Sequence, residues 1–143
     1  MNNKVVLAFS GGLDTSFCVP YLKEKGYEVH TVMVNTGGFS AEEEKAIESR
    51  ALALGAASHK NVNAVETYYT KGIKYLIYGN ILKNATYPLS VSSERVFQAL
   101  EVLKHVKELG AGAVAHGSTG AGNDQVRFDI VFEILAPEVK IIA

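Results

Sequence analysis

The sequence predicts an α/β protein of three layers, α/β/α, with a parallel sheet of about five strands between two layers of helices. Short apolar runs alternate with longer segments of helical periodicity along the whole chain. Two of the apolar runs end in glycine-rich loops, as strands beside a ligand site often do. With 143 residues and 48% hydrophobic content, the chain can bury the core of one domain.

Each predicted element follows from its local pattern. Strands are expected where β-branched and other apolar residues cluster, at 4–9, 27–34, 58–62, 113–116 and 139–143. Helices are expected at 17–25, 40–54, 64–78, 92–109 and 125–135, and segment 79–90 is expected to be irregular. Ser40 and Glu43 form a capping-box pattern, and Gly26, Gly55 and Gly110 follow the ends of predicted helices.

Several side chains are interpreted as packing groups. The 64–78 helix is expected to bury an apolar face, with its tyrosines packed rather than offered to a base; that face comprises Val65, Tyr68, Tyr69, Ile73, Leu76 and Ile77. Cys18 is expected to be a small core residue, since a single cysteine cannot form an internal disulfide. His30 alternates with apolar neighbours, which predicts a histidine packed on the sheet.

Charge and hydropathy narrow the function classes. The net charge is −1 and its signs are interspersed, which argues against a general nucleic-acid surface. No apolar run approaches the length of a membrane helix, and no secretory leader is visible, so we expect no membrane partner and a cytoplasmic location.

The loop from Ser10 to Ser16 lies between the first predicted strand and the first helix. Helix N-termini present unpaired N–H groups and a favourable dipole to anions, and Gly11 and Gly12 let the backbone approach a phosphate. The alternative is a tight turn in which Asp14, Thr15 or Ser16 merely caps the helix.

A second loop, Gly117 to Asp124, follows the strand at 113–116. Asp124 can accept an ammonium group, Asn123 can donate and accept, and Arg127 can form a fork with a carboxylate, which together suit amino-acid ligands. The alternative is a flexible loop with a solvated Asp124–Arg127 ion pair. Placing the strands at 4–9 and 113–116 side by side would put both loops around one crevice.

Both loops resemble known signatures. Ser-Gly-Gly-Leu-Asp-Thr-Ser, from Ser10, resembles the pyrophosphate loop (PP-loop) of the N-type ATP pyrophosphatases and lacks the Gly-Lys-Ser/Thr ending of a Walker A loop. Gly-Asn-Asp-Gln-Val-Arg-Phe, from Gly122, closely resembles a signature of the argininosuccinate synthase family. The resemblance runs from Ser10 to Ile142. It implies a Rossmann-like fold of the adenine nucleotide alpha hydrolase type, and ligation of citrulline to aspartate with release of AMP and pyrophosphate.

The resemblance also assigns site residues. The implied ATP contacts are Ala8, Phe9, Ser10, Gly11, Gly12, Leu13, Asp14, Thr15, Ser16, Val34, His116 and Gly117. Citrulline would contact Tyr87, Ser92, Asn123 and Arg127, and aspartate would contact Thr119, Asn123 and Asp124. No side chain is assigned as general acid or base, and Mg²⁺ would be held by the ATP phosphates rather than by protein side chains.

The chain departs from the family pattern at two places: Ala121 stands where many members have lysine, and Ser90–Glu94 replaces Gly-Thr-Ser-Leu-Ala. The resemblance implies that 1–143 is the ATP-binding domain and that the family's second catalytic and oligomerisation domain lies outside this chain. We therefore expect a homotetrameric parent enzyme, an inactive isolated chain and some self-association. The alternatives are a domain of another PP-loop adenylating enzyme or a non-catalytic ATP-binding module.

Overall fold

A five-stranded parallel sheet forms the centre of the molecule. The computed structural model describes residues 3–118, 120 and 122–143. The strands are β1 (Lys4–Ala8), β2 (Glu28–Asn35), β3 (Ser58–Asn63), β6 (Ala113–His116) and β7 (Lys140–Ile142), in the order β3-β2-β1-β6-β7. The predicted parallel sheet of about five strands is confirmed.

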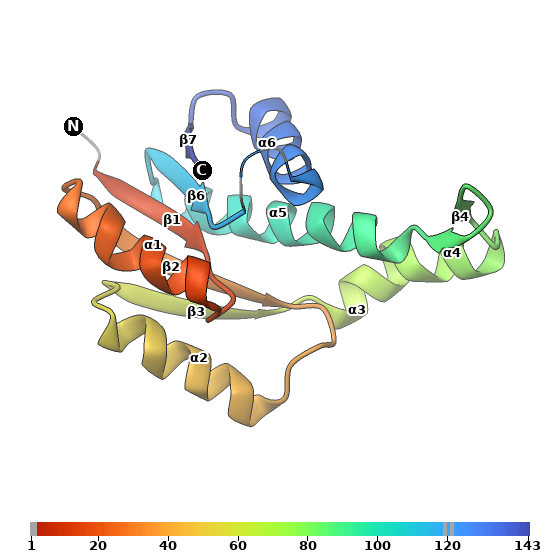
Figure 1. Ribbon diagram of the computed structural model, residues 1–143, viewed down its shortest axis with the longest axis horizontal. Helices are drawn as coiled ribbons and strands as arrows, with labels where there is room; N and C mark the ends of the chain where they lie inside the picture. Colours follow the sequence, from red (N-terminus) through yellow and green to blue (C-terminus); the bar gives the residue numbers. More distant parts are fainter. Residues whose placement is uncertain (1–2, 119, 121) are drawn as a thin grey trace.

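Helices cover both faces of this sheet, which confirms the three-layer prediction (Figure 1). Helices α1 (Leu13–Glu24) and α2 (Ala41–Ala53) pack on one face, and α5 (Ser90–Leu109) and α6 (Asn123–Leu135) on the other. Successive β1 residues alternate between the two cores: Val5 and Leu7 pack with α1 and α2, whereas Val6 packs with α5 and α6. Within the described ranges, no helix is long and apolar enough to cross a membrane.

The connection order reverses between β1 and β6. Strand β1 pairs with β2 on one side and with β6 on the other, and Ala8 lies opposite His116 in the β1–β6 register. Because both strands are parallel and end at this pair, the loops that follow them leave the sheet at the same point. This is the switch point where parallel α/β sheets bind ligands, and its predicted position is confirmed.

Three helices begin earlier than expected. Helix α1 begins at Leu13 instead of residue 17, α5 at Ser90 instead of 92, and α6 at Asn123 instead of 125. The first turns of these helices therefore hold polar residues that the sequence pattern predicts as loop. Serine, aspartate and asparagine are favoured in turns as well as at helix starts, so their presence does not distinguish the two.

An arm extends away from the sheet between β3 and α5 (Figure 1). It contains α3 (Val65–Tyr68), the π-helical turn η1 (Tyr69–Ile73), α4 (Lys74–Tyr78) and a small antiparallel hairpin of β4 (Leu82–Lys83) and β5 (Tyr87–Pro88). The prediction of one regular 64–78 helix followed by an irregular segment was therefore wrong in detail. Asn84 and Ala85 both have positive φ, as a tight hairpin turn of this hand requires.

The expected buried face of the arm was also wrong. Among its apolar residues only Tyr68 is buried, whereas Ile77 is 63% exposed and Tyr69 51% exposed. The arm stands clear of the sheet, and within the described part of the chain only its beginning packs on another element, where the Tyr68 ring lies 5.0 Å between centroids from the Phe97 ring of α5. The packing predictions for Cys18 and His30 are confirmed: Cys18 is partly buried against the α1–α2 core, and His30 is buried with Ser58 and Glu28 as hydrogen-bond partners.

The capping box of α2 gives a stability prediction. The Ser40 hydroxyl accepts from the Glu43 N–H at 3.3 Å, and the Glu43 carboxylate accepts from the Ser40 N–H at 2.8 Å. Ser40→Ala should lower the free energy of unfolding by about 1 kcal/mol, measured by urea denaturation. Ser40→Asp, which keeps an N-cap acceptor, should stay close to the parent; equal losses in both variants would contradict the role of the cap.

Candidate functional site

The β1–α1 loop is held in a fixed shape that leaves the N-terminus of α1 open. The Ser10 hydroxyl accepts from the Gly12 N–H at 3.4 Å and lies 3.3 Å from the Thr15 hydroxyl oxygen. Arg50 of α2 donates to the Gly11 carbonyl, a contact that sequence reasoning missed. Gly12 is the N-cap and offers no side chain to the first turn, so the helical N–H groups there remain available to an anion.

Two glycines make this geometry possible. Gly11 has φ +74°, and a Cβ there would lie 3.0 Å from Ile47 of α2. Gly117, directly after β6, approaches the start of α1 so closely that a Cβ would lie 3.0 Å from the Thr15 methyl and 3.2 Å from the Thr15 nitrogen. The two glycine-rich loops are therefore in contact, as the predicted strand order required.

A cavity of about 470 Å³ opens beside the β1–α1 loop, and we call it the α1 cavity. Of the twelve residues assigned to ATP, ten line it: Ala8, Phe9, Ser10, Gly12, Leu13, Asp14, Thr15, Val34, His116 and Gly117. Gly11 and Ser16 do not line it. Gly11 faces Ile47, and the Ser16 hydroxyl is buried without a hydrogen-bond partner in the described part of the chain.

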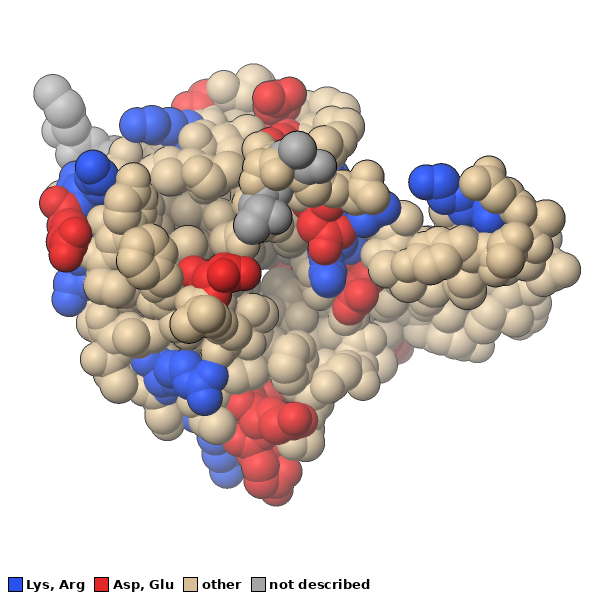
Figure 2. Space-filling view, in the orientation of Figure 1, with Lys and Arg blue, Asp and Glu red and all other residues tan. Residues whose placement is uncertain are grey.

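A second cavity of about 580 Å³ lies beside the start of α6, and we call it the α6 cavity. It gathers Tyr87, Ser92, Asn123, Asp124 and Arg127, which are all the assigned amino-acid contacts that the structure describes. Thr119, assigned to aspartate, and Ala121, one of the departures from the family pattern, lie outside the described residues. The space-filling view shows the hollowed face, with acidic and basic side chains around it (Figure 2).

The two cavities adjoin one another. Asp14, Gly117, Ser118 and Asp124 line both of them. The two cavities are therefore neighbouring parts of one hollow, which has room for two ligands side by side.

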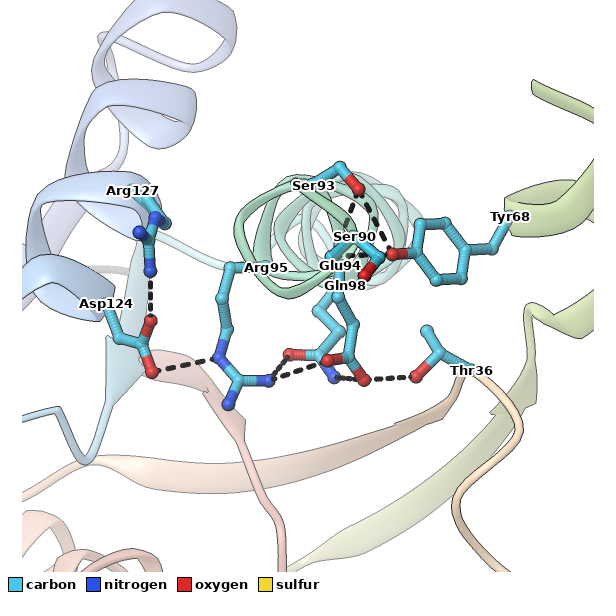
Figure 3. A network of polar contacts seen from close by, with 9 residues as sticks. All are labelled: Thr36, Tyr68, Ser90, Ser93, Glu94, Arg95, Gln98, Asp124 and Arg127. Atoms are coloured by element: carbon cyan, nitrogen blue, oxygen red, sulfur yellow. Dashed lines mark hydrogen bonds and ion pairs between the residues drawn. The ribbon is translucent and has the colours of Figure 1, made fainter. Parts of the chain in front are cut away.

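A network of polar contacts links side chains that line the two cavities (Figure 3). One Asp124 oxygen accepts from Arg127 at 2.7 Å, and the other accepts from Arg95 of α5 at 3.0 Å. Arg127 also donates to the Ser92 hydroxyl at 3.0 Å. The alternative interpretation of this loop from the sequence is a solvated Asp124–Arg127 ion pair. The structure shows that this ion pair is formed.

Arg95 has further partners on the side of the α1 cavity. Its guanidinium donates to the Gln98 side chain at 2.9 Å and lies 3.7 Å from the Glu94 carboxylate, which accepts from Thr36 at 2.5 Å. Sequence reasoning placed Glu94 and Arg95 at a helix start and gave them no role. No local pattern points to either residue, because their contacts reach from α5 to Asp124 of α6 and to Thr36 after β2.

His116 is buried at the end of β6. Its Nε2 lies 2.9 Å from an Asp129 oxygen, and its Nδ1 accepts from the Ser118 N–H at 3.3 Å. The ring also stacks on Phe128 at 5.4 Å between centroids. These contacts fix the ring, so His116 serves the α1 cavity as a rigid wall. Among the described residues, no group of three or more His, Cys, Asp or Glu side chains could hold a metal ion.

The charges around Asp124 give a prediction that NMR can test. Partial burial acts to raise the pKa of Asp124, but hydrogen bonds and charge from Arg95 and Arg127 together outweigh it and lower the pKa below its ordinary value of 3.8. Because the folded pKa is depressed, these contacts stabilise the fold fully above about pH 4, and the contribution is lost as pH falls through the folded pKa.

Arg95→Gln should move the carboxyl titration of Asp124 upward, measured by carboxyl-carbon NMR. Lys104→Gln is the matched control, because it removes a cation from the same helix, where Lys104 pairs with Glu101 instead. An unchanged Asp124 titration in Arg95→Gln would show that the ion pair is not formed in solution.

Comparison with known proteins agrees with this geometry. The family described as "Arginosuccinate synthase N-terminal HUP domain" matches residues 4–143. The chain is 49% identical to an argininosuccinate synthase of Xanthomonas axonopodis pv. citri, over 93% of this chain and 34% of that protein. It is 44% identical to one of Pyrobaculum aerophilum, over 99% of this chain and 35% of that protein. The chain thus spans about a third of the length of these curated relatives.

Two solved structures share the fold. A predicted subunit of tRNA methyltransferase from Methanocaldococcus jannaschii superposes with a TM-score of 0.61 at 20% identity, covering 98% of this chain and 66% of the other. The NMN synthetase of Francisella tularensis gives 0.63 at 8% identity, covering 82% and 46%. At these identities the likeness shows only the fold. The family match along nearly the whole chain shows that this protein belongs to the argininosuccinate synthase family and corresponds to its N-terminal HUP domain.

Proposed function

We propose that this chain is the nucleotide-binding part of a ligase that joins citrulline and aspartate at the expense of ATP, in arginine biosynthesis. The observation that carries the proposal is the contact between the α1 and α6 cavities through Asp14, Gly117, Ser118 and Asp124. A nucleotide held in the first cavity would present its phosphates to amino acids held in the second. The cytoplasmic location stays a prediction.

ATP fits the α1 cavity by chemistry. The uncapped N-terminus of α1 and the Ser10 and Thr15 hydroxyls offer donors to phosphate oxygens. Val32, Val34 and Phe128 supply apolar walls for the base and ribose. Mg²⁺ would enter on the phosphates, where it would offset the charge that develops as pyrophosphate leaves.

The α6 cavity supplies groups that match two amino acids. Arg127 would bind the citrulline carboxylate as a fork, and Asp124 would accept from the ammonium group of aspartate. Tyr87, Ser92 and Asn123 would complete the contacts to citrulline, and Asn123 would contact aspartate as well. Thr119 is also assigned to aspartate by the family resemblance.

The reaction then needs position more than acid–base chemistry. The ureido oxygen of citrulline attacks the α-phosphorus of ATP, and the bond to the β-phosphate oxygen breaks to release pyrophosphate. The amine of aspartate next attacks the activated ureido carbon, AMP leaves with the bonding electron pair, and the amine loses a proton. No side chain is assigned as general acid or base; the loop donors and the two cavities hold the reacting groups in line.

ATP binding to the isolated chain tests the first half of this proposal. Gly12 has an ordinary φ, and a Cβ there would meet only the Ser10 hydroxyl at 3.4 Å. Gly12→Val should therefore fold normally and place its methyl groups where phosphate would lie. Calorimetry should show that its ATP affinity is at least tenfold lower than that of the unchanged chain. The control is Leu52→Ala, on the exposed face of α2, because a second glycine such as Gly26 has a positive φ that valine would strain.

The isolated, unchanged chain, given ATP, Mg²⁺, citrulline and aspartate, should release no pyrophosphate above background. The residues of the α6 cavity form only one side of an amino-acid site, which leaves the activated intermediate open to water. Equal ATP affinity in Gly12→Val would reject the loop as the phosphate site. Turnover dependent on both amino acids would reject the view that this chain is only one part of the enzyme.

The arm gives a prediction about association. Its residues Tyr75, Ile77 and Tyr78 are 58%, 63% and 81% exposed, which is unusual for a contiguous apolar segment in a monomer. We propose that the rest of a longer parent enzyme, expected to be a homotetramer, covers this surface and that the isolated chain self-associates through it. Sedimentation velocity should show concentration-dependent dimers or larger species.

Ile77→Lys should shift this equilibrium toward monomer, whereas Leu52→Lys, on an exposed position of α2 away from the arm, should not. If the isolated chain without substitutions stays monomeric up to about 1 mM, a concentration at which weak association is measurable, the proposal is contradicted.

A further inference from the structure

The Asp124 carboxylate has both of its oxygens engaged in contacts within the protein. Arg127 donates to one at 2.7 Å and Arg95 to the other at 3.0 Å. An ammonium group entering the α6 cavity would add a third cation to this carboxylate and would compete with the two guanidinium groups that already neutralise it. The proposed function keeps Arg127 on the citrulline side, so the contact open to exchange is the one from Arg95.

Arg95 has a second direction in which to turn. It lines the α1 cavity together with the β1–α1 loop, and its side chain is 31% exposed, so it can change rotamer without crossing the core. A guanidinium forms planar, charge-assisted forks with phosphate oxygens as readily as with a carboxylate. A triphosphate in the α1 cavity would therefore compete with Asp124 for Arg95.

We propose that Arg95 is a positioning residue that couples the two cavities: it neutralises Asp124 until a nucleotide phosphate draws it away, and the freed Asp124 oxygen then receives the ammonium group of the amino-acid substrate. The inference rests on the proposed function, because it needs ATP in the α1 cavity. Its consequence is an order of binding, in which the nucleotide prepares the amino-acid site. Asp124 thereby stays paired with a cation at every stage, which avoids an unpaired, partly buried carboxylate.

The coupling is reciprocal by thermodynamic necessity, so it can be measured from the nucleotide side alone. If Asp124 and ATP compete for Arg95, removing the Asp124 charge must strengthen ATP binding. Asp124→Asn keeps the size of the side chain and removes the charge that holds the Arg95 Nε, while the contacts of Arg95 with Glu94 and Gln98 remain. We expect ATP affinity to rise about fivefold, at the low end of typical coupling factors.

A double-mutant cycle separates this coupling from general electrostatics. Loss of a negative charge near the phosphates would by itself strengthen ATP binding whether or not Arg95 is present. Calorimetry with ATP is therefore run on the parent chain, Asp124→Asn, Arg95→Met and the double variant. The proposal expects the gain from Asp124→Asn to disappear in the Arg95→Met background.

Three controls sharpen the result. Adenosine, which has no phosphate, should bind the parent and Asp124→Asn equally well. Glu133→Gln removes the same charge from an exposed position of α6 and should leave ATP affinity unchanged. If Arg95→Met does not fold, judged by circular dichroism, Arg95→Gln replaces it, because glutamine removes the charge and keeps a polar side chain at this partly exposed position.

The outcomes are distinguishable. If the parent chain binds no ATP, the proposed function fails and the coupling fails with it. If the parent binds ATP and the gain from Asp124→Asn is the same with and without Arg95, the nucleotide site stands and the coupling is overturned. If the gain depends on Arg95 and is absent with adenosine, the coupling is supported.

Discussion

The pairing of β1 with β6 is the constraint on which the rest of the site depends. It puts Ala8 opposite His116, so that two loops separated by about a hundred residues of sequence leave the sheet at neighbouring points. The register would not suffice by itself. Gly117 also matters, because a Cβ there would lie 3.0 Å from the Thr15 methyl and 3.2 Å from the Thr15 nitrogen, so the two loops would have to move apart. Strand pairing and one absent Cβ together bring the two cavities into contact.

The charges of the site are balanced within the protein. Arg127, Asp124, Arg95 and Glu94 alternate in sign from the start of α6 to the start of α5 (Figure 3). Each of these side chains is partly exposed, so the pairs contribute modestly to stability and their geometry matters more for ligands. A side chain in such a series can exchange one charged partner for another at a small cost in free energy, because each exchange replaces one charge-assisted contact by another.

Much of this arrangement could be predicted from sequence because it has short-range causes. The capping residues of α2, the glycines after the helices and the apolar strands each act within a few residues, and the strand order follows from where the glycine-rich loops must meet. The ten ATP-loop and strand-end residues that gather in the α1 cavity are neighbours in sequence or follow paired strands. Arg50 and Arg95 could not be found in this way, because Arg50 of α2 contacts the β1–α1 loop and Arg95 of α5 contacts α6, and no local pattern relates these elements.

The arm was the least predictable part, since its apolar residues follow a helical pattern, but only Tyr68 is buried, against Phe97 of α5, and most of the others face solvent. Hydrophobic periodicity indicates which side chains share a helix face, but it does not indicate which element, if any, packs against that face. The π-helical turn and the hairpin with Asn84 and Ala85 also depend on how the segment returns to the sheet rather than on propensity.

The attachment of the arm has a mechanical consequence. The Tyr68 hydroxyl donates to the Ser90 carbonyl at 2.6 Å and lies 3.1 Å from the Ser93 hydroxyl oxygen, so the root of the arm is fastened to the first turn of α5. The same turn carries Ser92 and is followed by Arg95. The arm and the contacts to Asp124 and Arg127 therefore share one helix end, and any displacement of the arm that moves Tyr68 acts on the same turn that carries Ser92.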